Sequence, residues 1–254
     1  MAAELERRRA DVLLCNGYKA ALLGRPAARR VGVPALAVSR GWTGESLRVR
    51  LYEAIDRLHL RWMDRVVCVS EAQARKVRRA GARPDRVRVI YNAVDLERFE
   101  DPDPDYRTRM FRYFRPGRER IVGAAGRLSP EKGFKVLVEA ARLVRMRDPS
   151  AGFVVFGEGP CRPRLTRQIE RAGLAGAFVL AGFRTDLDRF LPFFDLLALP
   201  SFTEGMPNVV LEAFAAGVPV VSTAVGGAPE LVEQGASGFL VPPGDPKALA
   251  DRIL

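Results

Sequence analysis

The chain contains a single histidine and only three cysteines, and this scarcity excludes several kinds of chemistry. His59 lies within a helical pattern predicted over Glu45–Met63, where we interpret it as a structural residue. A Ser-His-Asp hydrolase and a zinc site built on histidines are therefore disfavoured. Cys15, Cys68 and Cys161 are odd in number and far apart. They match no metal-binding spacing and indicate reduced, buried thiols in a cytoplasmic protein.

Long apolar runs are also missing. No run approaches the roughly 18 residues of a membrane span. The first nine residues, Met-Ala-Ala-Glu-Leu-Glu-Arg-Arg-Arg, lack the apolar stretch of a signal peptide. With 254 residues, 48% of them hydrophobic, the chain is long enough for one or two domains with a sizeable core.

What the sequence has in excess is positive charge, with a net value of +11 carried mostly by arginine. One interpretation is a basic face for anionic lipid, nucleic acid or a phosphorylated substrate. The favoured interpretation is an arginine bias spread over solvated helices. No nucleic-acid-binding motif is present, so no nucleic-acid partner is predicted, and peripheral contact with an anionic membrane stays open. The best candidates for a basic patch are Arg107, Arg109, Arg112, Arg115, Arg118 and Arg120.

Short apolar runs alternate with helical patterns along the whole chain. This rhythm predicts an α/β fold of βα units with parallel sheets buried on both faces. Helical segments are predicted between the strands, and examples besides the one that holds His59 are Glu71–Ala80, Pro130–Arg147 and Arg162–Ala172. The predicted strands are Asp11–Cys15, Ala35–Ser39, Arg65–Val69, Arg88–Tyr91, Arg120–Ala125, Gly152–Phe156, Ala177–Ala181, Leu196–Leu199, Val218–Ser222 and Gly238–Val241.

The rhythm breaks over residues 92–117, which include Asp-Pro-Asp-Pro-Asp at 101–105 and end in Arg-Pro-Gly. We interpret the break as a linker that carries a short helix. The predicted domains are a partial first domain over 1–95, the linker over 96–117 and a doubly wound domain over 118–254. Asp101 and Asp103 resemble an Asp-x-Asp metal motif, but a solvated loop is the favoured interpretation, and no metal is predicted.

A pair of glutamates brackets the N-terminus of a predicted helix. Pro207 and Asn208 suit the start of a helix that runs to about Ala216. Glu204 lies before its N-terminus and Glu212 lies in its body. A helix N-terminus attracts a negative group, and carboxylates bind hydroxyls. A nucleotide-sugar combines both features.

The loop from Gly126 to Gly133, Gly-Arg-Leu-Ser-Pro-Glu-Lys-Gly, follows a predicted strand. Ser129 is expected to cap the helix after it. Arg127 and Lys132 should lie near the carboxyl end of that strand, where open α/β sheets bind ligands. Two cations there could neutralise a diphosphate leaving group. The alternative is an ordinary loop with solvent-facing charges.

Three further predicted strands end in similar loops. These are Phe-Gly-Glu-Gly-Pro at 156–160, Gly-Phe-Arg at 182–184 and Gly-Gly-Ala-Pro-Glu at 226–230. Glycine allows close backbone approach, and an aromatic ring beside an arginine could hold a base. Each loop alone could be a plain turn. Five successive strand ends with ligand-binding chemistry favour one site at one edge of a sheet.

Together these segments resemble the family 4 retaining glycosyltransferases, which have two Rossmann-like domains facing a cleft, the B-type glycosyltransferase fold. The resemblance covers nearly the whole chain. Its matching segments are 126–133, 156–160, 204–213 (Glu-Gly-Met-Pro-Asn-Val-Val-Leu-Glu-Ala), 217–223 (Gly-Val-Pro-Val-Val-Ser-Thr), 225–230, 65–71 (Arg-Val-Val-Cys-Val-Ser-Glu) and 89–95 (Val-Ile-Tyr-Asn-Ala-Val-Asp).

The resemblance implies a role for each matched residue. Arg127 and Lys132 would bind the donor diphosphate, and Glu204 would face the donor sugar, as the catalytic residues. Glu212 would bind the ribose. The remaining donor-binding residues would be Gly126, Phe183 and Arg184 near the base, and Gly205, Met206, Pro207, Asn208 and Val209 at the helix N-terminus. It implies a UDP-sugar donor, no cofactor, no metal and retention at the anomeric carbon.

Some features depart from the family. Arg40 and Asn16 stand where the family usually has histidines, so donor contacts from the first domain are in question. The family's first domain begins with several βα units and a glycine-rich loop, and the family continues past Leu254. We therefore expect a chain truncated at both ends, with an exposed edge on its first sheet that promotes association.

Two functions stay open. One is a glycosyltransferase, cytoplasmic or peripheral at the inner membrane surface, that acts on a glycan, lipid-linked or small-molecule acceptor. The other is a truncated, non-catalytic nucleotide-sugar-binding protein.

Overall fold

The computed structural model describes residues 1–43 and 47–254. The chain divides into two compact units. The first comprises Met1–Asn92 together with Glu204–Met206. The second comprises Ala93–Thr203 together with Pro207–Leu254. The start of the helix predicted over Glu45–Met63 lies outside the described residues, and its remainder is α3, Leu47–Leu60.

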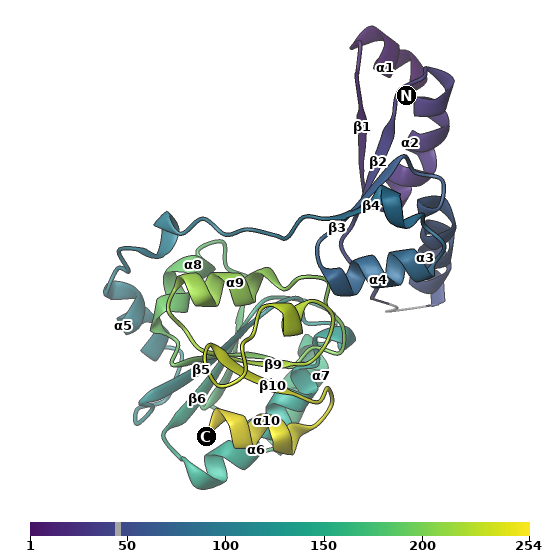
Figure 1. The fold of residues 1–254 in the computed structure, drawn as a ribbon. Coiled ribbons are helices and arrows are strands. Elements are labelled where there is room, and N and C mark those ends of the chain that lie inside the picture. The colour runs from purple at the N-terminus through teal and green to yellow at the C-terminus, as the bar shows by residue number, and fades with distance from the viewer. Residues whose placement is uncertain (44–46) are drawn as a thin grey trace. The chain divides into compact units, whose positions relative to one another are not determined.

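The first unit contains a four-stranded parallel sheet (Figure 1). Its strand order follows the chain, β1-β2-β3-β4. The strands are β1 (Leu13–Asn16), β2 (Ala35–Ser39), β3 (Arg65–Cys68) and β4 (Val87–Val89). The other helices of this unit are α1 (Ala2–Arg7), α2 (Tyr18–Arg30), α4 (Glu71–Arg79) and the single 3-10 turn η1 (Pro84–Arg86).

Among residues 1–43 and 47–92, the helices cover one face of this sheet. Parallel strands in sequential order, joined by right-handed crossovers, place successive helices on the same face. Side chains from all four α-helices accordingly join one core with alternate residues of each strand, such as Ala37 and Cys68. On the opposite face Leu36 and Val38 are half-buried and Leu14 is 60% exposed. The prediction of a parallel α/β sheet in the first unit is confirmed.

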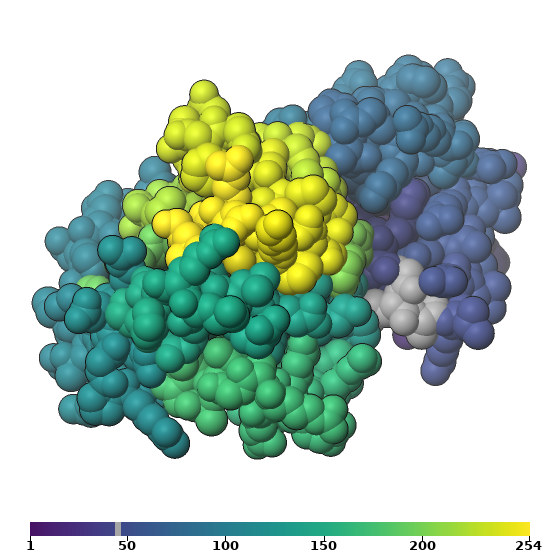
Figure 2. Space-filling model, turned by 90° about the horizontal axis from the view of Figure 1, so that it is seen from below, coloured from purple at the N-terminus to yellow at the C-terminus, as the bar shows by residue number. Residues whose placement is uncertain are grey.

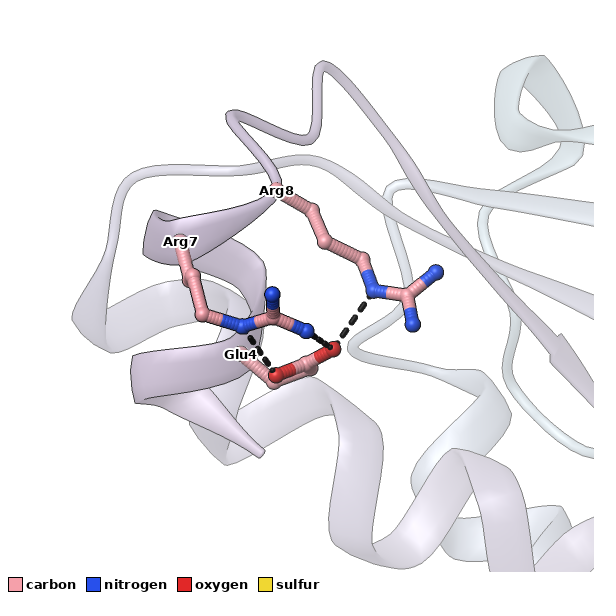
Figure 3. Close-up of polar contacts among 3 residues, drawn as sticks. All are labelled: Glu4, Arg7 and Arg8. Atoms are coloured by element: carbon pink, nitrogen blue, oxygen red, sulfur yellow. Dashed lines mark hydrogen bonds and ion pairs between the residues drawn. The ribbon is translucent and has the colours of Figure 1, made fainter.

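Part of the arginine excess is used in surface pairs on the first unit. In α1, Glu4 accepts hydrogen bonds from Arg7 Nε at 2.9 Å and Arg8 Nε at 2.5 Å (Figure 3). These two arginines lower the pKa of the Glu4 carboxyl, although all three side chains are exposed. Such pairs contribute little to stability and agree with a solvated, arginine-rich surface.

The second unit contains a six-stranded parallel sheet in the order β10-β9-β8-β5-β6-β7. Counted from β5 along the chain, this is the 3-2-1-4-5-6 order of a doubly wound dinucleotide-binding sheet. The order reverses between β5 and β8, and ligands of such sheets bind outside the carboxyl ends of the strands at that point. The strands are β5 (Arg120–Ala125), β6 (Ala151–Phe156), β7 (Phe178–Gly182), β8 (Leu196–Leu199), β9 (Val220–Thr223) and β10 (Gly238–Val241).

Helices cover both faces of this second sheet. On one face lie α6 (Phe134–Arg147), α7 (Arg162–Arg171) and α10 (Pro246–Ile253). Helix α10 packs against α6 (Figures 1 and 2). An ion pair between Arg147 and Asp251 at 3.0 Å joins the two helices. On the other face lie α5 (Asp105–Phe111), α8 (Leu187–Phe190) and α9 (Asn208–Ala215). Each face has its own apolar core, as expected for parallel strands buried on both sides.

The strand predictions agree with the structure to within two residues at each end. The linker carries the short helix that its sequence indicated, α5. Helix α2 lies between two predicted strands, where a helical segment was expected without stated bounds. The single helix predicted over Pro130–Arg147 is wrong in its first turn, since it is a 3-10 turn, η3 (Pro130–Lys132), followed by α6.

The single histidine of the chain packs against neighbouring side chains and backbone. His59 Nδ1 lies 3.1 Å from the Ile55 carbonyl oxygen, and its ring packs edge-on against Trp62, which confirms a structural role. All three cysteines are free thiols, and Cys15 and Cys68 are buried, whereas Cys161 is half-exposed. Burial raises the pKa of Cys68 to about 11, so this thiol is unreactive at neutral pH. Within the described ranges, no helix is both long and apolar enough to cross a bilayer.

Candidate functional site

A pocket of about 390 Å³ lies at the carboxyl ends of β5, β6 and β7 in the second unit. This volume is in the range of small-molecule sites. The pocket brings together five of the residues predicted from sequence: Gly126, Arg127, Phe183, Arg184 and Val209. The other lining residues are Ala125, Phe156, Gly157, Glu158 and Leu187.

Close backbone approach joins the loops that form the pocket. Gly157 has a φ of 144°, and a Cβ there would lie 1.9 Å from the Gly126 carbonyl oxygen, so only glycine fits. Gly126 N–H donates to the Phe156 carbonyl at 2.9 Å, and Gly157 N–H donates to the Gly182 carbonyl at 2.8 Å. These bonds connect the ends of three neighbouring strands into one rim.

The Gly126–Gly133 loop is fixed by its neighbours rather than by a cap. The expectation that Ser129 caps the following turn is wrong. Its hydroxyl instead donates to the buried Glu131 carboxylate. Gly133 has a φ of 66°, and a Cβ there would lie 2.0 Å from the Pro200 carbonyl oxygen at the end of β8. The methylenes of Lys132 pass beside Gly126, so this cation lies next to the pocket.

Arg184 is held in a chain of hydrogen bonds. Its Nε and Nη2 donate to the two oxygens of Asp186 at 2.8 and 2.6 Å. The hydroxyl of Tyr106, from α5, donates to Asp186 at 3.1 Å, and the Tyr106 ring packs edge-on against Phe190. Arg184 first, and Tyr106 next, lower the pKa of Asp186 to about 2. The Arg184 guanidinium is therefore positioned through Asp186 by Tyr106, which lies eighty positions before Asp186 in the chain.

Phe183 and the charged residues determine which kind of ligand the pocket suits. Phe183 is 71% exposed, which is unusual for a phenylalanine and leaves a ring face available for stacking. Arg127 is exposed at the pocket, whereas Glu158 pairs with Arg162 at 3.2 Å. An apolar floor with an aromatic ring and guanidinium groups suits a planar, anionic ligand such as a nucleotide.

Helix α9 follows the carboxyl end of β8 and contributes Val209 to the pocket. Pro207 is its N-cap residue and Asn208 its first helical residue, so the expected capping by Asn208 is wrong. Glu212 is half-buried in the second turn, and burial raises the pKa of its carboxyl. Nearby, Arg98 pairs with Asp188 at 2.9 Å. Glu212 therefore occupies a site where a carboxylate is disfavoured unless a ligand satisfies it.

Glu204, Gly205 and Met206 belong to the first compact unit and are not among the residues that line this pocket. Pro207, Asn208 and Glu212 also lie outside the lining. Their roles stay predictions. Asp101 and Asp103 are exposed, and Asp103 accepts from the Asp105 N–H at the start of α5. No cluster of potential metal ligands occurs within residues 1–43 and 47–254.

Sequence reasoning noted the glycines of the 156–160 loop without including Gly157 and Glu158 in the site. It missed Tyr106 and Asp186. The charged, turn-forming context of Asp186 beside Arg184 was visible in the sequence, but no signal connected Tyr106 to it. Such a pairing follows only from the fold.

A doubly wound sheet with glycine-rich strand ends, an arginine and an exposed aromatic ring is typical of nucleotide-binding proteins of the α/β class. The chain belongs to the glycosyltransferases. Residues 119–254 match the family described as glycosyl transferases group 1, and residues 1–98 match Glycosyltransferase Family 4.

Relatives of similar sequence agree with this assignment. A D-inositol 3-phosphate glycosyltransferase of Salinispora tropica is 37% identical over 210 residues, covering 75% of this chain and 43% of the relative. An Escherichia coli galactosyltransferase, UDP-Gal:alpha-D-GlcNAc-diphosphoundecaprenol alpha-1,3-galactosyltransferase, is 28% identical over 93% of this chain and 64% of its own length.

Among solved structures, Anabaena HepE in complex with UDP-glucose has a TM-score of 0.87 and 27% identity, covering 98% of this chain and 70% of HepE. These neighbours confirm the two-sheet B-type glycosyltransferase fold. The chain spans between about a third and two-thirds of the length of the curated relatives that it matches.

Proposed function

We propose that this chain carries the donor-binding half of a glycosyltransferase that takes a sugar from a UDP-sugar. The observation that carries the proposal is the pocket at the ends of β5, β6 and β7, with Arg127, Phe183 and Arg184 around an apolar floor. The presence of UDP in the similar HepE structures supports uracil as the base.

In this proposal each residue recognises one part of the donor. Phe183 and Arg184 contact the base, and Glu212 accepts hydrogen bonds from the ribose hydroxyls. Arg127 and Lys132 neutralise the diphosphate. Glu204 faces the sugar. The main chain from Gly205 to Val209, at the N-terminus of α9, binds sugar and phosphate.

The proposed reaction proceeds with retention of configuration. The bond between the anomeric carbon and the diphosphate oxygen breaks through an oxocarbenium-like state, and an acceptor hydroxyl attacks from the same face. The hydroxyl oxygen forms the new bond to the anomeric carbon, and its proton passes to the departing diphosphate oxygen. The departing diphosphate carries the developing negative charge, which Arg127, Lys132 and the helix N-terminus stabilise. With these groups in place the reaction needs no metal ion. The acceptor is a hydroxyl of a glycan, a lipid-linked sugar or a small molecule, and the reaction takes place in the cytoplasm or at the inner membrane surface.

Three measurements test these points. Calorimetry with UDP and UDP-glucose should give saturable binding, weakened about 10- to 100-fold in Arg127→Ala because a charge-assisted hydrogen bond is lost.

Proton NMR of the transfer product should show the anomeric configuration of the donor. Transfer should continue in excess EDTA. Absence of UDP binding would contradict the proposed donor. An inverted product would contradict retention. Loss of transfer in EDTA that divalent cations restore would contradict a metal-independent reaction.

A second candidate is a nucleotide-sugar-binding protein without turnover. Arg40 and Asn16 favour it, since they stand where the family usually has histidines. Both candidates predict UDP binding, so only a turnover assay separates them. Donor hydrolysis or sugar transfer by this chain, abolished by Glu204→Ala, would exclude the second candidate.

A further inference from the structure

A second pocket, unrelated to the donor site, lies within the first unit. It has a volume of about 440 Å³ and is found at the amino-terminal end of the first sheet. Ala35 begins β2, Asp64 immediately precedes β3, and Arg86 immediately precedes β4. Arg25 and Arg29 reach the pocket from the C-terminal half of α2. The remaining lining residues are Gly32, Val33, Pro34 and Trp62.

The charge of this pocket is unbalanced. Three guanidinium groups line it, against the single carboxylate of Asp64. That carboxylate accepts a hydrogen bond from the Ala35 N–H at 2.9 Å. Within the described part of the chain, none of the three arginines forms an ion pair with it or with any other acid. The lining therefore has a formal charge of about +2, which favours an anion.

Two of the guanidinium groups are held by main-chain carbonyls. Arg25 Nε donates to the Trp62 carbonyl at 2.8 Å, and the guanidinium lies 5.6 Å from the centre of the Trp62 ring. Arg86 Nη1 donates to the Met63 carbonyl at 3.3 Å. Each bond uses one donor and fixes the plane of the group, so several N–H donors stay available to a ligand.

The C-terminus of α2 lies near the pocket and would oppose an anion through its partial negative charge. Main-chain donors already cap this end, since Val31 N–H and Val33 N–H donate to the Ala28 carbonyl and Gly32 N–H donates to Arg29. The three full positive charges outweigh the remaining dipole, whose effect is typically below about 1 kcal/mol.

We propose that this pocket binds a phosphate group, presented by a free phosphate or phosphate ester or by a phospholipid headgroup. Planar guanidinium groups bind phosphate through paired hydrogen bonds, and several of them on a concave surface are the usual arrangement for it. The site is separate from the donor pocket. Its occupant is an effector or a second phosphorylated ligand, because open α/β sheets bind their main ligand at the opposite, carboxyl end of the strands.

Trp62 provides a local reporter, since it is 46% exposed in the pocket and the chain has only one other tryptophan. In a Trp42→Phe background, inorganic phosphate is titrated while Trp62 fluorescence is followed at constant ionic strength with chloride as the balancing anion. We expect a saturable change, with affinity about tenfold or more lower in Arg29→Gln and in Arg86→Gln. Arg83→Gln is the matched control, because Arg83 is exposed and pairs with Asp85 at 3.0 Å.

Co-sedimentation distinguishes the two sources of the phosphate group. Vesicles of phosphatidylglycerol in phosphatidylcholine are compared with phosphatidylcholine alone. Binding that needs phosphatidylglycerol and falls in Arg29→Gln but not in Arg83→Gln identifies a headgroup, and saturable phosphate binding without vesicle binding identifies a free phosphate. No saturable response to either probe, or equal losses in Arg83→Gln, would overturn the proposal. Circular dichroism and thermal melting of the same variants check that they are folded.

Discussion

At the residue scale, the candidate site separates into side chains that face a ligand and side chains that hold them. Arg127 and Phe183 are exposed at the pocket, whereas Asp186 and Tyr106 act through Arg184. The first kind could be predicted from sequence, because short motifs at strand ends mark it. The second kind could not, because Tyr106 and Asp186 meet only once the sheet has formed.

Glu212 is expected to lower the stability of the free protein and to strengthen the binding of UDP. Burial raises the pKa of its carboxyl, so the charged form is disfavoured in the folded protein at neutral pH. We expect Glu212→Gln to raise the melting temperature of the free protein at pH 7, and the gain should vanish as the pH falls and the wild-type carboxyl becomes protonated. The same change should weaken UDP binding about tenfold or more, because a charged acceptor for the ribose is lost. Scanning calorimetry and titration calorimetry measure the two effects. A variant less stable than wild type would contradict the account.

Asp186 should stabilise the second unit in a pH-dependent manner. Its folded-state pKa of about 2 is below the unfolded value near 3.9, so the stabilisation is complete above about pH 5 and is lost as the pH falls towards 2. Asp186→Asn should lower the free energy of unfolding by about 1–2 kcal/mol at pH 7, after allowance for solvent screening. Urea unfolding at pH 7, 5, 4 and 3 should show the difference narrowing below pH 4. Asp85→Asn, in an exposed pair, should have little effect at any pH. A difference independent of pH would rule out the ion pair as the cause.

At the element scale, strand predictions succeeded because buried parallel strands are short, continuous apolar runs with polar ends. The bounds of helices were harder to predict from sequence than those of strands. The Pro130–Lys132 turn was merged with α6, although Gly133 adopts a left-handed conformation that ends the first turn. The reason lies outside the local sequence, in the Pro200 carbonyl that leaves no space for a side chain at Gly133.

Strand β1 is an edge of the first sheet and should promote self-association. Leu14 is 60% exposed on the face that the helices leave open. Free strand edges beside apolar side chains pair with other chains unless charge blocks them. We expect the protein to associate with increasing concentration and Leu14→Lys to reduce this. Light scattering after size-exclusion chromatography measures it. Leu23→Lys, at a leucine 63% exposed on α2, is the control. A wild-type chain that stays monomeric at every concentration would refute the prediction.

At the scale of the whole molecule, each unit has a pocket lined by arginines, and the two pockets lie at opposite ends of their strands. The donor pocket of the second unit lies at the carboxyl ends, and the arginine-lined pocket of the first unit lies at the amino ends. The fold of the second unit could be predicted from sequence alone, since its motifs follow strand after strand. The pocket of the first unit could not, because Arg25, Trp62 and Arg86 carry no motif and meet only through the sheet.

The most direct test of the central claim is titration calorimetry of UDP with the wild-type chain and two arginine variants. Arg127 follows the carboxyl end of β5, whereas Arg120 begins the same strand at the opposite edge and is also exposed. The account predicts saturable binding of one UDP, weakened about 10- to 100-fold in Arg127→Ala and unchanged in Arg120→Ala. No binding by the wild-type chain, or an equal loss in both variants, would contradict it.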